Sequence, residues 1–322
     1  MARPTRVALA LGSGGARGYA HIGVIGELQD RGYEIVTVAG SSIGALVGGL
    51  HCAGRLDEYV DWITGLSQLD VMRLMDVSLS KRGGVIGAER ILARVRDILG
   101  DVVIEDLATP FTAVATDLDA GRPVWYQRGS LVDAIRASIA IPGVISPHTY
   151  EGRLLGDGGI LDPLPVAPTS AIPSDVTVGV ILGADSAPEF GATRERKSPG
   201  VLRRNAAEIL ESDFMRNMRD RFGIEADDAT EIADADDTLM ADAESTDGAP
   251  RTKMGRIEVL SRSLDIMQEA LTRYQVAGYP PDVLIRVPRK SVRTLDFHKA
   301  TEMIELGRAL TATALDQLPE RA

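Results

Sequence analysis

Two serines stand between glycines at residues 38–46, which read VAGSSIGAL. The run Gly40-Ser41-Ser42-Ile43-Gly44 matches the pattern G-x-S-x-G, whose middle serine is Ser42. In this pattern a sharp strand-to-helix turn exposes the serine hydroxyl, and the new helix presents its positive end to it. Ser42 is therefore a candidate nucleophile for acyl transfer. The alternative is that Ser41 or Ser42 is only a helix N-cap, a position that favours serine.

A glycine-rich segment, GSGGARG at residues 12–18, follows the first apolar run of the chain. Successive glycines let backbone N–H groups point into one concavity, which suits a developing oxyanion. The rival interpretation is the dinucleotide pattern G-x-G-x-x-G after a first strand. Gly12 and Gly14 fit that pattern, but Arg17 occupies the third glycine position, and no acid ends the next strand. The oxyanion interpretation is therefore preferred.

The partner that would take a proton from Ser42 is open to two interpretations. A triad in the order Ser42, Asp157, His298 is formally possible, although His298 lies in a charged helix start. The other histidines are His21, His51 and His148.

Asp157 is a second candidate on its own, in the run LGDGGI at residues 155–160. Gly158 and Gly159 give the acid little side-chain cover, so the backbone can bring it against another element. A β-turn is the competing interpretation, because Asp-Gly is a strong turn signal.

The elements that would position these residues follow an α/β pattern. Residues 6–12 and 35–40 are predicted strands, and residues 18–31 and 43–54 are predicted helices. This order implies a parallel pair of strands joined by a crossover, in a layered fold. Further strands are expected at 111–117, 123–127, 176–182 and 283–287. Further helices are expected at 56–66, 88–99, 130–139, 200–222, 254–276 and 299–318.

The bulk composition narrows the class of protein. The chain has 322 residues, and its single cysteine, Cys52, excludes an internal disulfide. The net charge of −11 is concentrated at residues 225–248, which hold ten acidic residues and no Lys or Arg. The rest of the chain is thus close to neutral, with no basic footprint for nucleic acid. With few histidines and one cysteine, we expect no metal site.

Three segments are relevant to membrane contact or to disorder of the chain. No run of 18 apolar residues is present, so we expect a cytoplasmic protein without a membrane span. Residues 71–87 suggest a lid or interfacial contact, or else an ordinary loop. Residues 200–222 suggest a basic amphipathic helix for an anionic membrane surface, or else a helix packed on the core. Residues 225–250 are expected to form a disordered acidic insert.

These motifs together resemble those of the patatin-like phospholipase family. The resemblance rests on GSGGARG, GSSIG, ASIAIPGVISP (137–147), GRLLGDGGILDPLP (152–165) and DFHKATEMIELG (296–307), in that order. It implies a three-layer α/β/α sandwich with a mainly parallel sheet, similar to cytosolic phospholipase A2, as a single catalytic domain over residues 5–322.

The resemblance also implies roles for the site residues. Ser42 is the nucleophile and Asp157 its base, with no catalytic histidine and no cofactor. The oxyanion site is expected from the backbone of Gly14, Gly15 and Ile43, with Arg17 ordering the loop. The supporting motif glycines are Gly12, Gly18, Gly40, Gly44, Gly158 and Gly159.

The activity implied is hydrolysis of phospholipid or lysophospholipid esters through an acyl-enzyme. Because a carboxylate is a weak base for an alcohol, a partly desolvated Asp157 with a raised pKa is expected. The alternatives are an esterase or thioesterase acting on small acyl esters, and a non-catalytic lipid-binding module. The expected partners are an acyl-ester substrate and an anionic membrane surface.

Overall fold

The computed structural model describes residues 3–74, 89–184 and 256–317. These residues belong to one compact unit, which comprises Met1–Ala187 and Met254–Ala322. The predicted helix at 200–222, the acidic insert at 225–250 and most of the segment 71–87 lie outside the described residues. The membrane contact inferred from them, and the single domain over residues 5–322, stay predictions.

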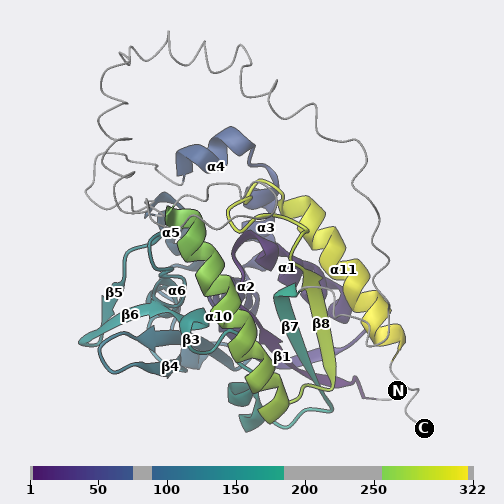
Figure 1. Cartoon of the computed structure of the whole chain (residues 1–322). Coiled ribbons are helices and arrows are strands. Elements are labelled where there is room, and N and C mark those ends of the chain that lie inside the picture. The colour runs from purple at the N-terminus through teal and green to yellow at the C-terminus, as the bar shows by residue number, and fades with distance from the viewer. Residues whose placement is uncertain (1–2, 75–88, 185–255, 318–322) are drawn as a thin grey trace, which may run out of the picture. The chain divides into compact units, whose positions relative to one another are not determined.

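An eight-stranded sheet forms the centre of the described unit (Figure 1). Its order is β5-β6-β3-β2-β1-β7-β8, and β4 also pairs with β3. The pairs from β3 through β2, β1 and β7 to β8 are parallel, whereas the pairs of β3 with β4, β3 with β6 and β5 with β6 are antiparallel. The strands are β1 (Arg6–Leu11), β2 (Glu34–Ser41), β3 (Phe111–Asp117), β4 (Arg122–Tyr126), β5 (His148–Tyr150), β6 (Arg153–Asp157), β7 (Val176–Ala184) and β8 (Val283–Pro288).

Helices cover both faces of this sheet, because the strands bury side chains on both sides. In β1, Val7, Leu9 and Leu11 face the larger core, whereas Ala10 joins a smaller one with Leu164. The helix α10 (Arg256–Gly278) lies on the face of the smaller core (Figure 1). The other helices are α1 (Ala20–Asp30), α2 (Ile43–Cys52), α3 (Leu56–Thr64), α4 (Gln68–Leu74), α5 (Glu89–Leu99), α6 (Leu131–Ser138) and α11 (Ala300–Asp316). The prediction of a three-layer α/β fold with a mainly parallel sheet is confirmed.

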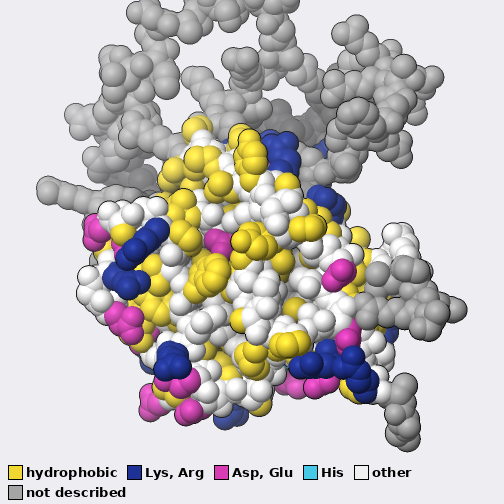
Figure 2. Space-filling model, turned by 90° about the horizontal axis from the view of Figure 1, so that it is seen from below, with side chains coloured by type: hydrophobic (Ala, Val, Ile, Leu, Met, Phe, Trp, Pro, Cys, Tyr) yellow, Lys and Arg dark blue, Asp and Glu magenta, His cyan; other side chains and the backbone are white. Residues whose placement is uncertain are grey.

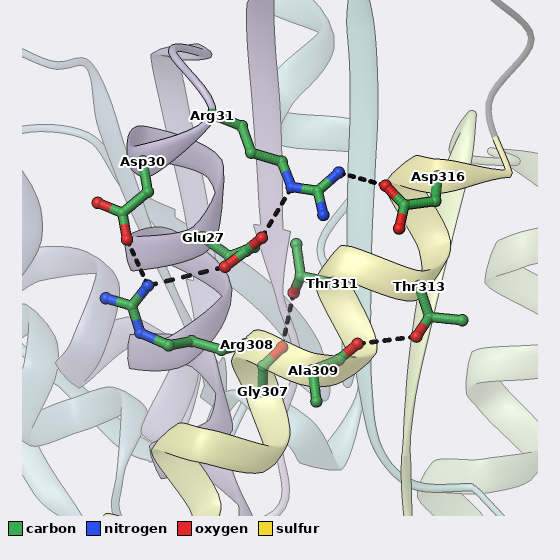
Figure 3. Close-up of polar contacts among 9 residues, drawn as sticks. All are labelled: Glu27, Asp30, Arg31, Gly307, Arg308, Ala309, Thr311, Thr313 and Asp316. Atoms are coloured by element: carbon green, nitrogen blue, oxygen red, sulfur yellow. Dashed lines mark hydrogen bonds and ion pairs between the residues drawn. The ribbon is translucent and has the colours of Figure 1, made fainter.

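The helices α1 and α11, from opposite ends of the sequence, lie side by side (Figure 3). A Cβ atom on Gly307 would stand 2.0 Å from the carbonyl oxygen of Ala20, so only glycine permits this approach. Ion pairs border the contact, with Arg31 bonded to Asp316 at 2.6 Å and Arg308 to Asp30 at 2.5 Å. Because these charges are largely exposed, the close helix packing contributes more stability than the ion pairs do.

The end of the unit seen in Figure 2 has no large field of one charge among its described residues. Most of its Lys, Arg, Asp and Glu side chains lie toward the rim, and its hydrophobic side chains form separate groups (Figure 2). Scattered apolar side chains are normal on a protein surface. This face therefore offers no basic surface of the kind that binds nucleic acid. Within the described ranges, no helix is both long and apolar enough to cross a bilayer.

The predicted strands and helices within the described residues are present, with ends that agree or differ by at most two residues. Among the α-helices and strands of the described residues, three were not predicted: α4 and the antiparallel strands β5 and β6. The hairpin is short, and its second strand runs straight into the Asp-Gly pair that the sequence marks as a turn. That strand is the one that carries Asp157.

Candidate active site

The register of the sheet places the candidate residues at the same level on neighbouring strands. Leu11, just before the glycine loop, pairs with Gly40, just before the serines. On the next strand Ser41 pairs with Val114, and beyond it Ala115 pairs with Asp157. The glycine loop, the serine turn and the acid therefore meet at the same level of the sheet, although they are far apart in sequence.

Ser42 sits in the turn between β2 and α2 with an unusual backbone. Its φ of 56° and ψ of −124° place a non-glycine residue at positive φ, which costs of the order of 1–3 kcal/mol. Two bonds hold the turn: the Ser42 N–H donates to Oγ of Ser138 at 2.8 Å, and that hydroxyl donates to the carbonyl of Val114 at 2.5 Å. The strained geometry is thus fixed from the neighbouring strand.

The hydroxyl of Ser42 donates to Oδ2 of Asp157 at 2.5 Å. The other carboxylate oxygen accepts the N–H of Gly159 at 2.7 Å. The backbone of Asp157 is fixed by Thr116, whose hydroxyl donates to its carbonyl at 2.8 Å. Both side chains are buried, and burial raises the pKa of Asp157 to about 7 against the opposing effect of its two hydrogen bonds. The carboxylate is therefore a much better proton acceptor than an exposed aspartate.

At every motif glycine, atoms of another residue lie so close to the backbone that a side chain would not fit. At each one, a Cβ atom would stand within 3.0 Å of another atom. At Gly158 that atom is the carbonyl oxygen of Val114, at 2.1 Å, which lets Asp157 lie tight against β3. At Gly44 it is the carbonyl oxygen of Leu11, also at 2.1 Å, which seats α2 against β1. The same holds for Gly12, Gly14, Gly15, Gly18, Gly40 and Gly159.

The glycine loop is tied down by its own N–H groups and by Arg17. Gly12, Ser13 and Ala16 donate to backbone carbonyls elsewhere, in the case of Ala16 to that of Thr294 at 2.9 Å. The buried guanidinium of Arg17 donates to the carbonyl of Gly14 at 3.2 Å. Arg17 is not among the residues that line the pockets at Ser42, so it orders the loop from behind.

No histidine stands between Ser42 and Asp157, because the two side chains are bonded directly. The triad with His298 is therefore not formed, and His298 lines neither pocket at Ser42. His148 bonds to Asp133 at 3.1 Å instead. His21 is fully buried, with its Nε2 2.9 Å from the Gly12 carbonyl, and burial lowers its pKa to about 4. It is thus a neutral donor that holds the glycine loop.

Two pockets open at Ser42, and they differ in polarity. The mixed pocket is lined by Ser42, Asp157 and the glycine loop, and also by side chains of α10. It is lined by Ser13, Gly14, Gly15, Ser42, Ile141, Pro142, Val144, Asp157, Ile160, Leu260, Leu264, Asp265, Gln268, Thr294 and Leu295. The apolar pocket shares Gly15, Ser42, Ile141, Val144 and Leu295 with it. Its other lining residues are Tyr19, Ile43, Leu46, Tyr59, Trp62, Ile63, Leu66, Val71, Leu74, Ile91, Ile139, Ile145 and Phe297.

Several residues of the site were not expected from the sequence. Ser138 clamps the serine turn, and α10 supplies Leu264, Asp265 and Gln268 to the mixed pocket. Ser138 stands at the end of a helix before the run AIPG, where nothing in its local pattern marks it. The sequence gives α10 its helical period but not the element that it faces.

The fold and the serine–aspartate site together define the class of protein. The family model described as "Patatin-like phospholipase" matches residues 9–170. The chain belongs to this family, whose members are generally lipid acyl hydrolases.

Among individual relatives, an NTE family protein of Mycobacterium tuberculosis, named as uncharacterized, is 50% identical over 332 residues. That match covers 97% of this chain and 91% of the relative. Neuropathy target esterase sws of Drosophila grimshawi is 36% identical over 166 residues, which is 49% of this chain and 11% of that protein. The crystal structure of VipD from Legionella pneumophila matches with a TM-score of 0.43 and 16% identity, over 98% of this chain and 67% of that one.

Proposed function

We propose that this protein is a serine lipid acyl hydrolase that uses Ser42 and Asp157 as a catalytic dyad. The observation that carries the proposal is the bond from Ser42 Oγ to a buried carboxylate, located where an apolar pocket and a mixed pocket meet. A nucleophile with an adjacent base, set beside an apolar pocket, is what hydrolysis of an acyl ester requires.

In the first half of the reaction, Ser42 Oγ attacks the ester carbonyl while Asp157 takes its proton. The tetrahedral oxyanion is bound by backbone N–H groups, for which we propose Gly14, Gly15 and Ile43. The first two line the mixed pocket beside Ser42. Ile43 is the first residue of α2, where helical N–H groups lack intrahelical acceptors. The N–H of Ser42 itself is occupied by Ser138.

Collapse of the tetrahedral species breaks the ester C–O bond, and the protonated Asp157 gives its proton to the leaving alcohol. Water then attacks the acyl-enzyme, Asp157 takes a proton from it, and the second collapse returns that proton to Ser42 Oγ. The acid product leaves and the dyad is restored. Besides the ester and water, these proposed steps use only groups of the chain.

The apolar pocket is the proposed site for the acyl chain. Apart from Gly15 and Ser42 at its opening, all of its lining side chains are hydrophobic. Burial of each methylene of an acyl chain there is favourable by about 0.8 kcal/mol. A long-chain ester therefore fits better than the small acyl esters or thioesters of the alternative. Phospholipids and lysophospholipids are the first lipids to test, given the name of the family.

Covalent labelling with a fluorophosphonate probe tests the dyad. The phosphorus of the probe bonds to the serine oxygen, and fluoride leaves. We expect labelling of the wild type and of Ser41→Ala, and its loss in Ser42→Ala and Asp157→Asn. The hydroxyl of Ser41 is buried beside Gly158, so Ser41→Ala is the matched control. Labelling that survives in Ser42→Ala, or a folded wild type that does not label, would contradict the proposal and favour the lipid-binding alternative.

A further inference from the structure

The charged side chains that line the mixed pocket, among the described residues, are all acidic. If the acyl chain occupies the apolar pocket, the alcohol part of the ester lies in the mixed pocket, on the other side of Ser42. The ionisable side chains among the described residues that line it are Asp157 and Asp265, both acids. The apolar pocket adds no Lys, Arg or His from these residues either. Among the described residues that line the two pockets, the leaving group thus meets two carboxylates and no cation.

Of the arginines near this pocket, Arg17 and Arg289 have partners, and Arg262 of α10 is not among the residues that line it. The Arg17 guanidinium donates to Gly14 and to Thr294, and one of its nitrogens lies 3.6 Å from Asp265. Arg289 bonds to Glu269 at 2.6 Å and to the carbonyl of Gly183 at 3.2 Å. Arg17 partly balances Asp265 from behind, but its side chain is 4% exposed and is not among those that line the pocket.

The side chains opposite Ser42 are better suited to an uncharged alcohol. Gln268 and Thr294 offer hydrogen bonds to hydroxyl groups, and Leu260 and Leu264 offer apolar contact. The phosphate of a glycerophospholipid is only a few bonds from its ester. With the carbonyl at Ser42, that phosphate would lie near Asp265, where water is partly excluded and repulsion between like charges is strong.

We propose that the preferred substrates are lipid esters whose alcohol carries no anionic group, such as acylglycerols, rather than esters that carry a phosphate next to the glycerol. This inference rests on the proposed function and narrows its substrate class. It departs from the phospholipid preference that the resemblance implies.

The test compares three substrates with the same oleoyl chain: monooleoylglycerol, oleoyl lysophosphatidylcholine and oleoyl lysophosphatidate. Each is presented at the same mole fraction in micelles of a neutral detergent, and kcat/KM is measured at pH 8. We expect kcat/KM for the neutral glycerol ester to exceed that for lysophosphatidate at least tenfold, with the zwitterionic ester between them. Equal or faster cleavage of the lysophosphatidate would overturn the proposal.

Two variants test the cause of the preference. Asp265→Asn removes the negative charge at nearly constant shape, and Gln268→Lys adds a positive charge to the same pocket. Both variants should lower, severalfold, the ratio of kcat/KM for the neutral glycerol ester to kcat/KM for lysophosphatidate. Asp316→Asn, which removes an exposed acid at the end of α11, is the control and should leave the ratio unchanged. If neither pocket variant changes the ratio in folded protein, the charge of the pocket is not its cause and the proposal fails.

The outcomes separate this inference from the proposed function. A protein that takes up no fluorophosphonate and cleaves none of the three esters contradicts the hydrolase itself. A protein that labels at Ser42 but prefers the lysophosphatidate keeps its dyad and loses only the substrate class argued here. Labelling without cleavage of any of the three lipids also overturns the inferred class, because it removes acylglycerols from the substrates.

Discussion

The variant Asp157→Asn tests two consequences of burying this acid: its effect on the reactivity of Ser42 and its effect on the stability of the fold. Burial raises the pKa of Asp157 from 3.8 to about 7. At pH 5 about 1% of such a group is ionised, and at pH 8 about 90%, so the rate of labelling by fluorophosphonate should rise about 90-fold between these two pH values. Asp157→Asn has no base at either pH, and its labelling should be slow and nearly independent of pH.

The same shift predicts a change in stability with a definite sign. The folded state holds the Asp157 proton more tightly than the unfolded chain, so the free energy of unfolding falls as the pH rises from about 4 to about 7. Three pH units at about 1.36 kcal/mol each give an upper limit of about 4 kcal/mol. Asp157→Asn removes this cost. It should unfold at higher urea concentration than the wild type at pH 8, with little difference at pH 4.

Asp162→Asn is the matched control for both measurements. Asp162 is a second buried acid of the same loop, its pKa is raised to about 6 by burial, and it accepts a bond from Gln275 at 2.8 Å instead of one from Ser42. Its replacement should also stabilise the protein at pH 8 but leave the midpoint of the labelling profile near 7. A profile that is flat from pH 5 to pH 8, or wild-type labelling of Asp157→Asn, would refute the assignment of the base.

Three further comparisons test other parts of the structure. Ser42→Gly and Ser42→Ala should both be inactive, but Ser42→Gly should be more stable by about 1 kcal/mol in urea unfolding, because glycine adopts the positive φ at that site without strain; equal stability would count against strain. Trp62→Ala should lower kcat/KM for a decanoyl ester about tenfold relative to an acetyl ester, because Trp62 lines the apolar pocket; a uniform loss would place the acyl chain elsewhere. Gly307→Ala should lower the free energy of unfolding by about 1–3 kcal/mol and Arg308→Ala by at most about 1 kcal/mol; the reverse order would mean that the ion pairs dominate.

The sequence marked Ser42 and Asp157 as candidates, because each lies in a short glycine-bounded run. Their pairing came from the family resemblance, since the residues alone left a triad with His298 and a β-turn at Asp157 open. The flanking glycines leave space for the backbone of another element, and the structure fills that space with Leu11 and Val114. The parallel order of the first strands also followed from local periodicity.

The parts that the sequence did not predict depend on long-range register. Ser138 acts on Ser42 across 96 positions, and its own neighbourhood reads as an ordinary helix end. The inner face of α10 becomes a wall of the mixed pocket through its position beside Ser42 and Asp157, residues far away in sequence, which periodicity does not reveal. The hairpin that carries Asp157 was missed because a short strand followed by Asp-Gly has the pattern of a turn alone.

The bond from the Ala16 N–H to the Thr294 carbonyl has a consequence for the order of events in folding. Ser42 and Asp157 can pair once β2, β3 and β6 have formed, whereas the Ala16 end of the glycine loop is anchored only after the chain has returned from its far end. Closing so long a loop is entropically costly and slow. In refolding, recovery of reactivity at Ser42 should therefore lag behind recovery of helix and sheet in circular dichroism, and simultaneous recovery would show that the loop is set without that anchor.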